Sequence, residues 1–516
     1  MQSTLRAKRP TWLLALLPLG ALSTAAQAMD YGNDEYGFSL GGYLRGWTSF
    51  NLNNAPETRG NDKGKLSMLR GSLLLDADAV TGPLTWKAIG RFDKEWMTGY
   101  QDDLQDINRS MVNTGYRGRG SDLMDEYDRA ELREFYFDYE YDRVKFRVGK
   151  QQVVWGETDF FRAMDVVHGF DYRWRSFLEP ENEELRKPLI MFNTTVQVPE
   201  LDGSLQVLVR PGWDAHNAIG NSVDFYGGRW APQPYRGTDF FSLLDTDYDH
   251  PSGDNEKVTG GLRWSGLAGD VNYSLAWLKS YQGDPVVNSR FAPYKKTPKG
   301  VLGDVIHPEI TVWGATASTY VAAADAVFST EVVYTEGVGF NQGSYQNPMF
   351  GGAVPPGFAG LQRKDTLTTM LRMDKTVDLT RVLGTSRPSF LSMQLFNTRV
   401  LGFDSDDDLV ELAAYGAKKR RDTMLFTTVL QTNYRNDTIN PSLAAGIDVN
   451  NKGGFLIPAV EFALGDSWRL RAEADLFYAA GRGSDGGGDA QGKGDTRLFG
   501  YFDNHDQLVL RLTRQF

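Results

Sequence analysis

The chain has 516 residues and no cysteine, and its 55 lysines and arginines are outnumbered by 66 aspartates and glutamates, for a formal net charge of -11. The lack of cysteine excludes disulfides and thiolate metal sites, and so acidic a chain is a poor candidate for binding nucleic acid. With 55 glycines, 23 tyrosines and 29 phenylalanines, the composition fits one large β structure at least as well as two or more soluble domains.

Residues 1–28 have the pattern of a cleavable secretory signal peptide. Three basic residues stand within the first nine positions, an apolar run covers 12–22, and Ala26 and Ala28 provide a small-residue exit. The apolar run is shorter than the roughly 20 residues that a membrane-spanning helix needs. We therefore expect cleavage after Ala28 and one mature domain, residues 29–516. Loss of the three basic residues leaves 52 against 66 acidic residues, a net charge of -14.

Beyond the signal peptide, apolar and polar residues alternate in many segments, which is typical of strands with one apolar face. No stretch resembles a transmembrane helix. The clearest alternating segments are 38–45, 69–79, 84–93, 134–149, 271–277, 328–334 and 468–476.

The connections between these segments differ in length according to the side on which they fall. Long connections occupy one side, at 53–65, 98–130, 155–187, 212–255, 281–307, 337–362, 401–421 and 480–502. Mostly tight ones occupy the other, at 80–83, 142–143, 200–203, 267–269, 320–322, 375–387, 434–437 and 465–466. This asymmetry predicts an all-β fold: a single antiparallel transmembrane β-barrel with long extracellular loops and short periplasmic turns. We expect about 18 strands; the alternative is 16, because 188–211 and 438–464 are weakly patterned.

The last segment carries an apolar face formed by Leu508, Leu510 and Leu512, which Phe516 continues. It resembles the terminal strand by which the outer-membrane assembly machinery recognises its clients, so that machinery is an expected partner. Arg514 departs from the pattern, but an arginine close to the membrane edge can extend its head group to the interface.

Charged residues on the polar faces of the strands are mixed in sign, so the sequence indicates no simple anion or cation filter. Cross-strand pairing is their ordinary role. The inward side chains that we expect to line the lumen are Arg91, Lys145, Arg147, Arg471 and Asp138. Tryptophans near strand ends are expected in aromatic girdles or inside loops: Trp47, Trp86, Trp96, Trp264, Trp277 and Trp468.

The most distinctive loop follows the strand that ends near Gly149 and runs to Pro188. It resembles the uncharacterised proteobacterial outer-membrane family known as domain-of-unknown-function family 1302, whose members show a G-[RK]-Q…W-G strand end, a D-V-V-N-P…D-[FY]-R stretch and a later R-x-P. Positions that match are Gly149, Gln151, Trp155, Gly156, Asp165, Asp171, Arg173, Arg186 and Pro188. His168-Gly169 replaces the usual Asn-Pro, which puts the local turn in doubt.

The resemblance implies a barrel that moves hydrophobic or lipid-like molecules, with an inner-membrane exporter as a partner, and it supplies no catalytic residues. Physically, a loop so rich in aromatic residues either folds into the pore as a constriction or packs on the rim. A barrel of about 18 strands would be an open channel unless something narrowed it, so we regard the two positions of the loop as equally supported. The constriction residues we expect are Trp155, Phe160, Phe161 and Tyr172.

The sequence gives little sign of an enzyme. The five histidines show no metal-ligand spacing, and His250-Pro251-Ser252 lies in a long loop instead of on a strand, so we expect no catalytic residues and no cofactor. A structural calcium site is a minor hypothesis: Asp245, Asp247, Asp249 and Glu256 have the spacing of an oxygen-ligand loop, although His250 stands where the turn requires glycine. A solvated run of surface charge is the simpler interpretation.

These features predict a porin-like channel or transport barrel for small or amphiphilic solutes in the cell outer membrane of a Gram-negative bacterium. Its expected surroundings are outer-membrane lipid and lipopolysaccharide, and its expected ligand is a small solute. The alternative is a structural barrel whose loops at 98–130 and 212–255 dock a partner. An outer-membrane hydrolase is a third hypothesis, which the missing catalytic pattern disfavours.

Overall fold

The computed structural model describes residues 29–33, 35–54, 60–112, 123–158, 161–173, 175, 179, 182–223, 244–344, 354–413, 417–479, 497–503 and 505–516. The predicted signal peptide and Phe160 lie outside the described residues. Among the described residues, no helix is both long and apolar enough to cross a membrane.

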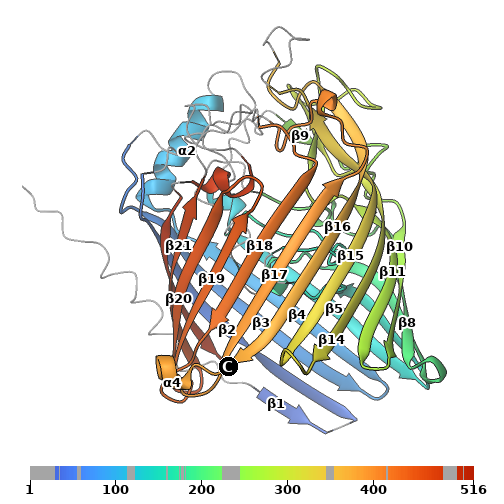
Figure 1. Cartoon of the computed structure of the whole chain (residues 1–516), viewed down its shortest axis with the longest axis vertical. Coiled ribbons are helices and arrows are strands. Elements are labelled where there is room, and N and C mark those ends of the chain that lie inside the picture. Colours follow the sequence, from blue (N-terminus) through green and yellow to red (C-terminus); the bar gives the residue numbers. More distant parts are fainter. Residues whose placement is uncertain are drawn as a thin grey trace, which may run out of the picture.

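Eighteen antiparallel strands form a closed barrel, which confirms the predicted fold and strand count (Figure 1). The barrel closes where β2 pairs with β22, from Tyr43↔Gln515 to Asn51↔Gln507. Its strands are β2 (Tyr36–Asn51), β3 (Leu66–Thr81), β4 (Leu84–Glu95), β5 (Arg129–Tyr141), β6 (Val144–Gln151), β7 (Leu189–Val198), β8 (Gly203–Arg210), β10 (Thr259–Ala268), β11 (Val271–Tyr281), β14 (Glu309–Val321), β15 (Ala326–Gln342), β16 (Gly360–Val377), β17 (Ser389–Val400), β18 (Asp422–Gln431), β19 (Ile439–Asp448), β20 (Gly454–Leu464), β21 (Trp468–Tyr478) and β22 (Gln507–Gln515).

Several short elements were not predicted from the sequence. A further strand, β1 (Met29–Gly32), pairs with β2 below the end of β22. A separate three-stranded sheet is built from β9 (Leu244–Thr246), β12 (Val286–Ser289) and β13 (Gly303–Ile306). The helical elements are α2 (Gly99–Val112), α3 (Asn182–Leu185), α4 (Thr380–Leu383), and the 3-10 turns η2 (Leu123–Glu126), η4 (Pro199–Leu201), η5 (His216–Ala218), η8 (Ser405–Asp407) and η9 (Leu498–Phe502).

The two ends of the barrel differ as the connection lengths predict. At the short-turn end, β5 and β6 are joined by Asp142 and Arg143 alone, and Asp142 has a φ of 51°. Asp202 and Asp325 adopt the same left-handed conformation in their turns, which aspartate tolerates better than most residues. At the other end lie the long connections, together with α2 and β9 (Figure 1).

The outer and inner faces of the wall differ in chemistry. Apolar side chains such as Leu275 and Leu371 stand exposed on the outer face, whereas Ser274, Arg91 and Gln394 point inward and are buried. That division is the one a bilayer requires, with hydrocarbon outside and polar groups inside. The girdle interpretation was wrong for Trp47, which is 2% exposed and lies on the inner face.

Candidate functional site in the barrel lumen

The described residues of the segment between β6 and β7, residues 152–188, lie inside the barrel, and this segment is called the pore loop below. Its described residues contact strands on both sides of the lumen. Trp155 donates a hydrogen bond from Nε1 to Gln206 of β8 at 2.8 Å, and Arg175 forms an ion pair with Glu473 of β21. The pore loop therefore extends across the lumen and does not pack on the rim.

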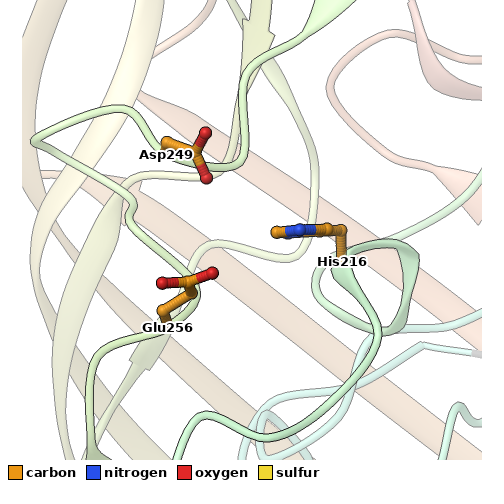
Figure 2. Close-up of side chains that lie close together, drawn as sticks. All are labelled: His216, Asp249 and Glu256. Carbon is orange, nitrogen blue, oxygen red and sulfur yellow. The ribbon is translucent and has the colours of Figure 1, made fainter.

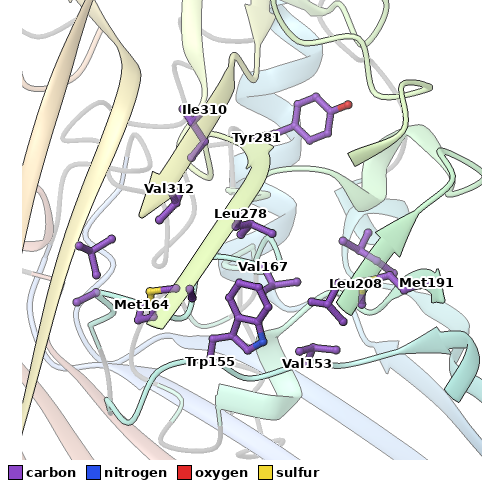
Figure 3. Packing of buried hydrophobic residues seen from close by; sticks show 14 of the residues in the cluster. Val153, Trp155, Met164, Val167, Met191, Leu208, Leu278, Tyr281, Ile310 and Val312 are labelled. Atoms are coloured by element: carbon purple, nitrogen blue, oxygen red, sulfur yellow. The ribbon is translucent and has the colours of Figure 1, made fainter. Parts of the chain in front are cut away.

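The first half of the pore loop is apolar and packs against the wall formed by β7 to β17 (Figure 3). Met164 is fully buried, and its sulfur would lie 2.1 Å from a Cβ added at Gly314 of β14. A larger residue at Gly314 would displace the loop. The cluster includes Val153, Trp155, Ala163, Met164 and Val167 of the loop with Met191, Leu208, Leu278, Ile310, Val312, Val333, Met370 and Phe396 of the wall.

Backbone amides of the same half are held by one carboxylate. Glu331 of β15 accepts hydrogen bonds from the backbone N–H of Met164 at 2.8 Å and of Glu157 at 2.7 Å. Glu331 is 1% exposed, and a buried carboxylate is costly unless hydrogen bonds satisfy it. The sequence signal that could have revealed it is an acid at an inward position of β15, two residues before the apolar Val333 on the same face.

Three of the four expected constriction residues are described, and all three lie in the lumen. Trp155 is in the apolar cluster, and the ring of Phe161 lies 6.3 Å from Phe396 of β17 and 5.7 Å from Phe499. Tyr172 is stacked on Phe170 with the ring centroids 6.0 Å apart. The structure therefore places the three residues in the lumen but in different clusters: Trp155 belongs to the apolar cluster above, Tyr172 packs against a second cluster that includes Phe170 and Phe499, and Phe161 packs against both.

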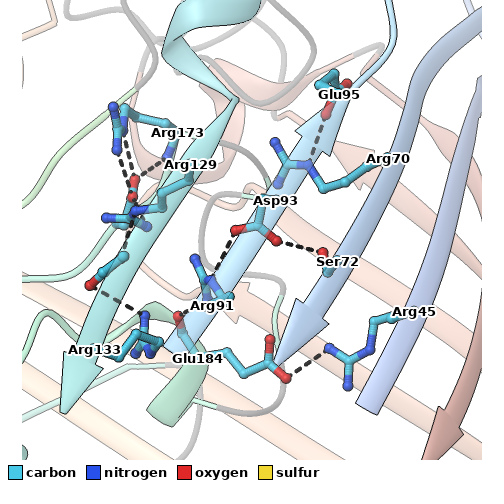
Figure 4. A network of polar contacts seen from close by, with 12 residues as sticks. Arg45, Arg70, Ser72, Arg91, Asp93, Glu95, Arg129, Arg133, Arg173 and Glu184 are labelled. Atoms are coloured by element: carbon cyan, nitrogen blue, oxygen red, sulfur yellow. Dashed lines mark hydrogen bonds and ion pairs between the residues drawn. The ribbon is translucent and has the colours of Figure 1, made fainter. Parts of the chain in front are cut away.

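The second half of the pore loop is held by charged groups (Figure 4). Glu184 accepts a hydrogen bond from Arg45 of β2 at 2.7 Å and from the Tyr43 hydroxyl at 3.0 Å. Its backbone carbonyl accepts from Arg91 of β4 at 2.9 Å. Arg133 of β5 donates to the carbonyl of Arg186 at 2.8 Å. These arginines hold the loop against the wall formed by β2 to β5.

A second charged group lies on the wall formed by β21 and β22. Arg175 pairs with Glu179 at 3.0 Å and with Glu473, and Glu179 also pairs with Arg511 of β22 at 3.2 Å. All four side chains are buried. Because removing one member leaves the others as uncompensated buried charges, such a group is sensitive to single substitutions.

The expected lumen residues fall into separate places. Arg91 contacts the pore loop, whereas Asp138, Lys145 and Arg147 form a cross-strand group on β5 and β6 near the short turn, with Arg147 to Asp138 at 2.7 Å and Lys145 to Asp138 at 3.2 Å. Arg471 lines a cavity of about 530 Å³ toward the other short turns, together with Glu461 and Asp437. The structure does not bring these five residues together.

Burial changes the acid–base behaviour of the loop. His168 accepts a hydrogen bond at Nε2 from the Val153 N–H at 2.8 Å, and its Nδ1 lies 2.9 Å from the Lys187 carbonyl. Desolvation lowers the pKa of His168 to about 4 and that of Lys187 to about 7. Although Asp171 is buried too, Arg129 and Arg173 hold its pKa well below the usual range. His168 is thus a neutral structural residue at the position where the loop departs from the family pattern.

The expected calcium ligands are divided. Asp247 pairs with Lys296 at 2.6 Å, and Asp245 lies in β9 opposite Asp304. Asp249 and Glu256 instead meet His216, with ligand atoms of the three residues within 4.8 Å of one another (Figure 2). All three are exposed, so a solvated surface group remains the simpler interpretation, and calcium stays a prediction.

The model of the family described as "Protein of unknown function (DUF1302)" matches residues 9–516, and no curated protein matches. Among solved structures, the chain is similar to OccAB1 of Acinetobacter baumannii, with 10% identity over 96% of this chain and 99% of that one and a TM-score of 0.47. OpdK of Pseudomonas aeruginosa, solved with vanillate, has 9% identity over 93% and 98%, with a TM-score of 0.42. OmpT of Vibrio cholerae has 10% identity over 95% and 100%, with a TM-score of 0.38.

Proposed function

We propose a function from the premise that the chain belongs to the DUF1302 family, whose description assigns no activity. The protein is a transport barrel of the outer membrane that passes small or amphiphilic solutes through its lumen, and the pore loop closes that lumen until it is displaced. The observation that best supports this proposal is the position of the pore loop, whose described residues cross the lumen from β8 to β21.

Barrel size supports this proposal. A closed barrel of 18 strands is wide enough to hold an aqueous channel unless something fills it. Here the filling segment is anchored by hydrogen bonds and ion pairs to inward side chains, and a polar cavity of about 530 Å³ remains on the short-turn side. A barrel that served only as a scaffold for docking would have no use for such a cavity.

Conductance across a planar bilayer tests the proposal. We expect the wild-type barrel to give rare, brief current steps. Arg175→Ala removes the ion pair that ties the pore loop to Glu473 of β21 and leaves an excess of buried negative charge there. This change should loosen the second half of the loop and make open steps frequent. The matched control is Arg143→Ala, which removes an exposed ion pair with Glu200 in the short-turn region and should behave like the wild type.

Absence of current in all variants would contradict the proposal. If neither the wild type, nor Arg175→Ala, nor a barrel lacking 158–180 carries current, the protein is not a channel. A stable partner cross-linked to the 98–130 or 212–255 loops would then favour the docking alternative. Signal cleavage after Ala28, the outer-membrane location and the exporter partnership belong to the same proposal, and fractionation and co-purification from the native membrane test them.

A further inference from the structure

The barrel wall has a notch above the end of β6. The register of β5 with β6 stops at Phe135↔Lys150, whereas β5 begins at Arg129, which is paired with Asp93 of β4. Among the described residues, the 129–134 segment of β5 therefore has a strand neighbour on the β4 side alone. The chain leaves the wall here because residues after Gln151 enter the lumen as the pore loop.

A cavity of about 830 Å³ lies at this notch. It is lined by Leu132 and Ile190, which belong to the outer face of the wall, and also by Glu131 and Lys187, which lie on the inner side. Leu132 is 54% exposed. Residues of both faces therefore line one cavity, which lies along the edge of the 129–134 segment of β5.

Side chains replace the missing strand along the notch. Lys150 Nζ donates to the Leu132 carbonyl at 2.9 Å, and Gln152 Nε2 donates to the Glu134 carboxylate at 2.9 Å. Unpaired strand backbone at membrane depth is tolerated where it lines a water-filled cavity. Side-chain hydrogen bonds therefore stabilise this edge of β5, and no other strand of the described residues pairs with it.

Aromatic residues place the notch at the boundary of the outer leaflet. Trp96, which follows β4, and Trp213, which follows β8, are both exposed on the wall, and the ring of Trp213 lies 6.1 Å from that of Phe192. Exposed tryptophans of barrels mark the height of the lipid head groups. A lipid-like molecule at the notch would thus have its chain beside hydrocarbon and its head group at the level of the cavity.

The inner side of the notch carries an excess of positive charge. Arg129 pairs with Glu131 and with Asp171, each at 2.7 Å, and Arg173 pairs with Asp171 at 2.9 Å (Figure 4). Among the described residues, the arginines of this side, Arg129, Arg133 and Arg173, share the carboxylates of Glu131 and Asp171. Lys150 stands at the outer mouth, on the face of Phe135 and Ile190, and its Nζ lies 4.0 Å from Glu131. Three acids lie at the margin of the cavity, Asp125, Asp128 and Asp214, of which Asp128 pairs with Lys94 and Asp214 with Arg210.

We propose that the notch is a lateral portal for a single-chain amphiphile with an anionic head group, whose chain lies between Leu132 and Ile190 and whose head group reaches Lys150. The inference rests on the proposed transport function and adds the route: the solute passes between the lumen and the outer leaflet through the wall. The apolar residues with Lys150 at the outer mouth, and the arginines on the inner side, match the two parts of such a molecule.

Photolabelling of the full-length barrel in detergent micelles tests the portal. The probe is palmitate carrying a diazirine on its chain, and the comparison probe is the uncharged alcohol with the same chain. Palmitate should label residues 130–132 and 188–192 in preference to lipid-facing Leu275 and Leu371. Lys150→Met should lower that labelling about tenfold, since a charge-assisted hydrogen bond is lost, while labelling by the alcohol stays unchanged.

Two further variants complete the test. The matched control is Lys375→Met, which also removes a lysine that donates to a backbone carbonyl, that of Ala324, at 2.6 Å; it should leave labelling intact. Leu132→Trp fills the outer mouth without a change of charge and should lower labelling as strongly as Lys150→Met. Equal labelling of all lipid-facing segments, or labelling that both notch variants leave intact, overturns the portal. If the notch is labelled but the barrel never conducts current, the portal is retained and the open channel is rejected.

Discussion

The two halves of the pore loop are held in the lumen by different kinds of contact. The first half is packed into an apolar cluster around Trp155 and Met164 against β7 to β17. The second half is tied by ion pairs of Glu184 and Arg175 to β2 and β21. Apolar packing is insensitive to pH and salt, whereas buried ion pairs depend on the charge of every member.

This difference assigns the halves different roles. The apolar half is the fixed attachment, which connects directly to β6 and fills the lumen beside β14 and β15. Under the proposed function, the charged half is the part that is released, because loss of one charge unbalances the buried ion pairs that hold it. Variants that act on one half only can separate the two roles.

The largest expected effect is on the fixed half. Trp155→Ala removes a side chain that is 1% exposed together with its hydrogen bond to Gln206, and it should lower the free energy of unfolding by about 3–5 kcal/mol. Thermal unfolding followed by circular dichroism measures this. The control Trp213→Ala, at an exposed position, should change stability by less than about 1 kcal/mol. Equal effects of the two variants would mean that the cluster does not anchor the loop.

A smaller effect is expected from the charged half. Glu184→Gln keeps the shape of the side chain but leaves Arg45 as a buried cation, which should cost about 3 kcal/mol. In addition, this variant should release the second half of the loop. Limited proteolysis of the folded barrel would detect the release as faster cleavage between α3 and β7. The exposed Glu200, whose partner is Arg143, supplies the control Glu200→Gln, which should leave proteolysis unchanged. Resistance of Glu184→Gln to protease would contradict the release model.

Acidification should weaken the loop through His168. Unfolded histidine binds a proton below its ordinary pKa of 6.5, whereas burial lowers the pKa of His168 to about 4 in the folded chain. Between pH 6.5 and 4 the unfolded state therefore binds more protons, and stability falls as the pH is lowered, by about 2 kcal/mol at pH 5. His168→Gln should flatten the stability profile over this range.

The flattening is expected to be partial. Burial also lowers the pKa of His307 to about 4, so that residue keeps part of the dependence. The exposed His216 serves as the control, and His216→Gln should leave the profile as steep as in the wild type. A profile for His168→Gln that matches the wild type would show that His168 is not buried as a neutral residue.

Strand positions were predictable from the sequence because each side of the wall meets a different medium. The clear alternating segments fall in β2, β3, β4, β5, β6, β11, β15 and β21. The lengths of the connections predicted which end of the barrel carries the long loops. Even the weakly patterned 188–211 and 438–464 form strands in pairs, as an antiparallel barrel requires. The inward position of Trp47 could also have been predicted. Side chains two residues apart in a strand share a face, and Arg45 was expected on the polar inner face.

Contacts of the pore loop were not predictable in the same way. Aromatic content suggested Trp155, Phe161 and Tyr172, but Arg175, Glu179 and Glu473 meet only because of the path that the loop takes through the lumen. No periodic pattern records such a path. The short strands β1 and β9 escaped for a related reason, since three or four residues are too few to show alternation.

The position of the pore loop is tested most directly by photo-crosslinking from Phe161. Replacing Phe161 by p-benzoylphenylalanine keeps an aromatic ring at this position, and peptide mapping after irradiation of the barrel in native membranes identifies what the ring touches. The account predicts cross-links to the peptides that contain Phe396 of β17 and Phe499 of η9, both of which contact Phe161. A pore loop that closes the lumen would be contradicted by cross-links to lipid or to external segments such as helix α2. It would also be contradicted if no part of the inner wall were cross-linked.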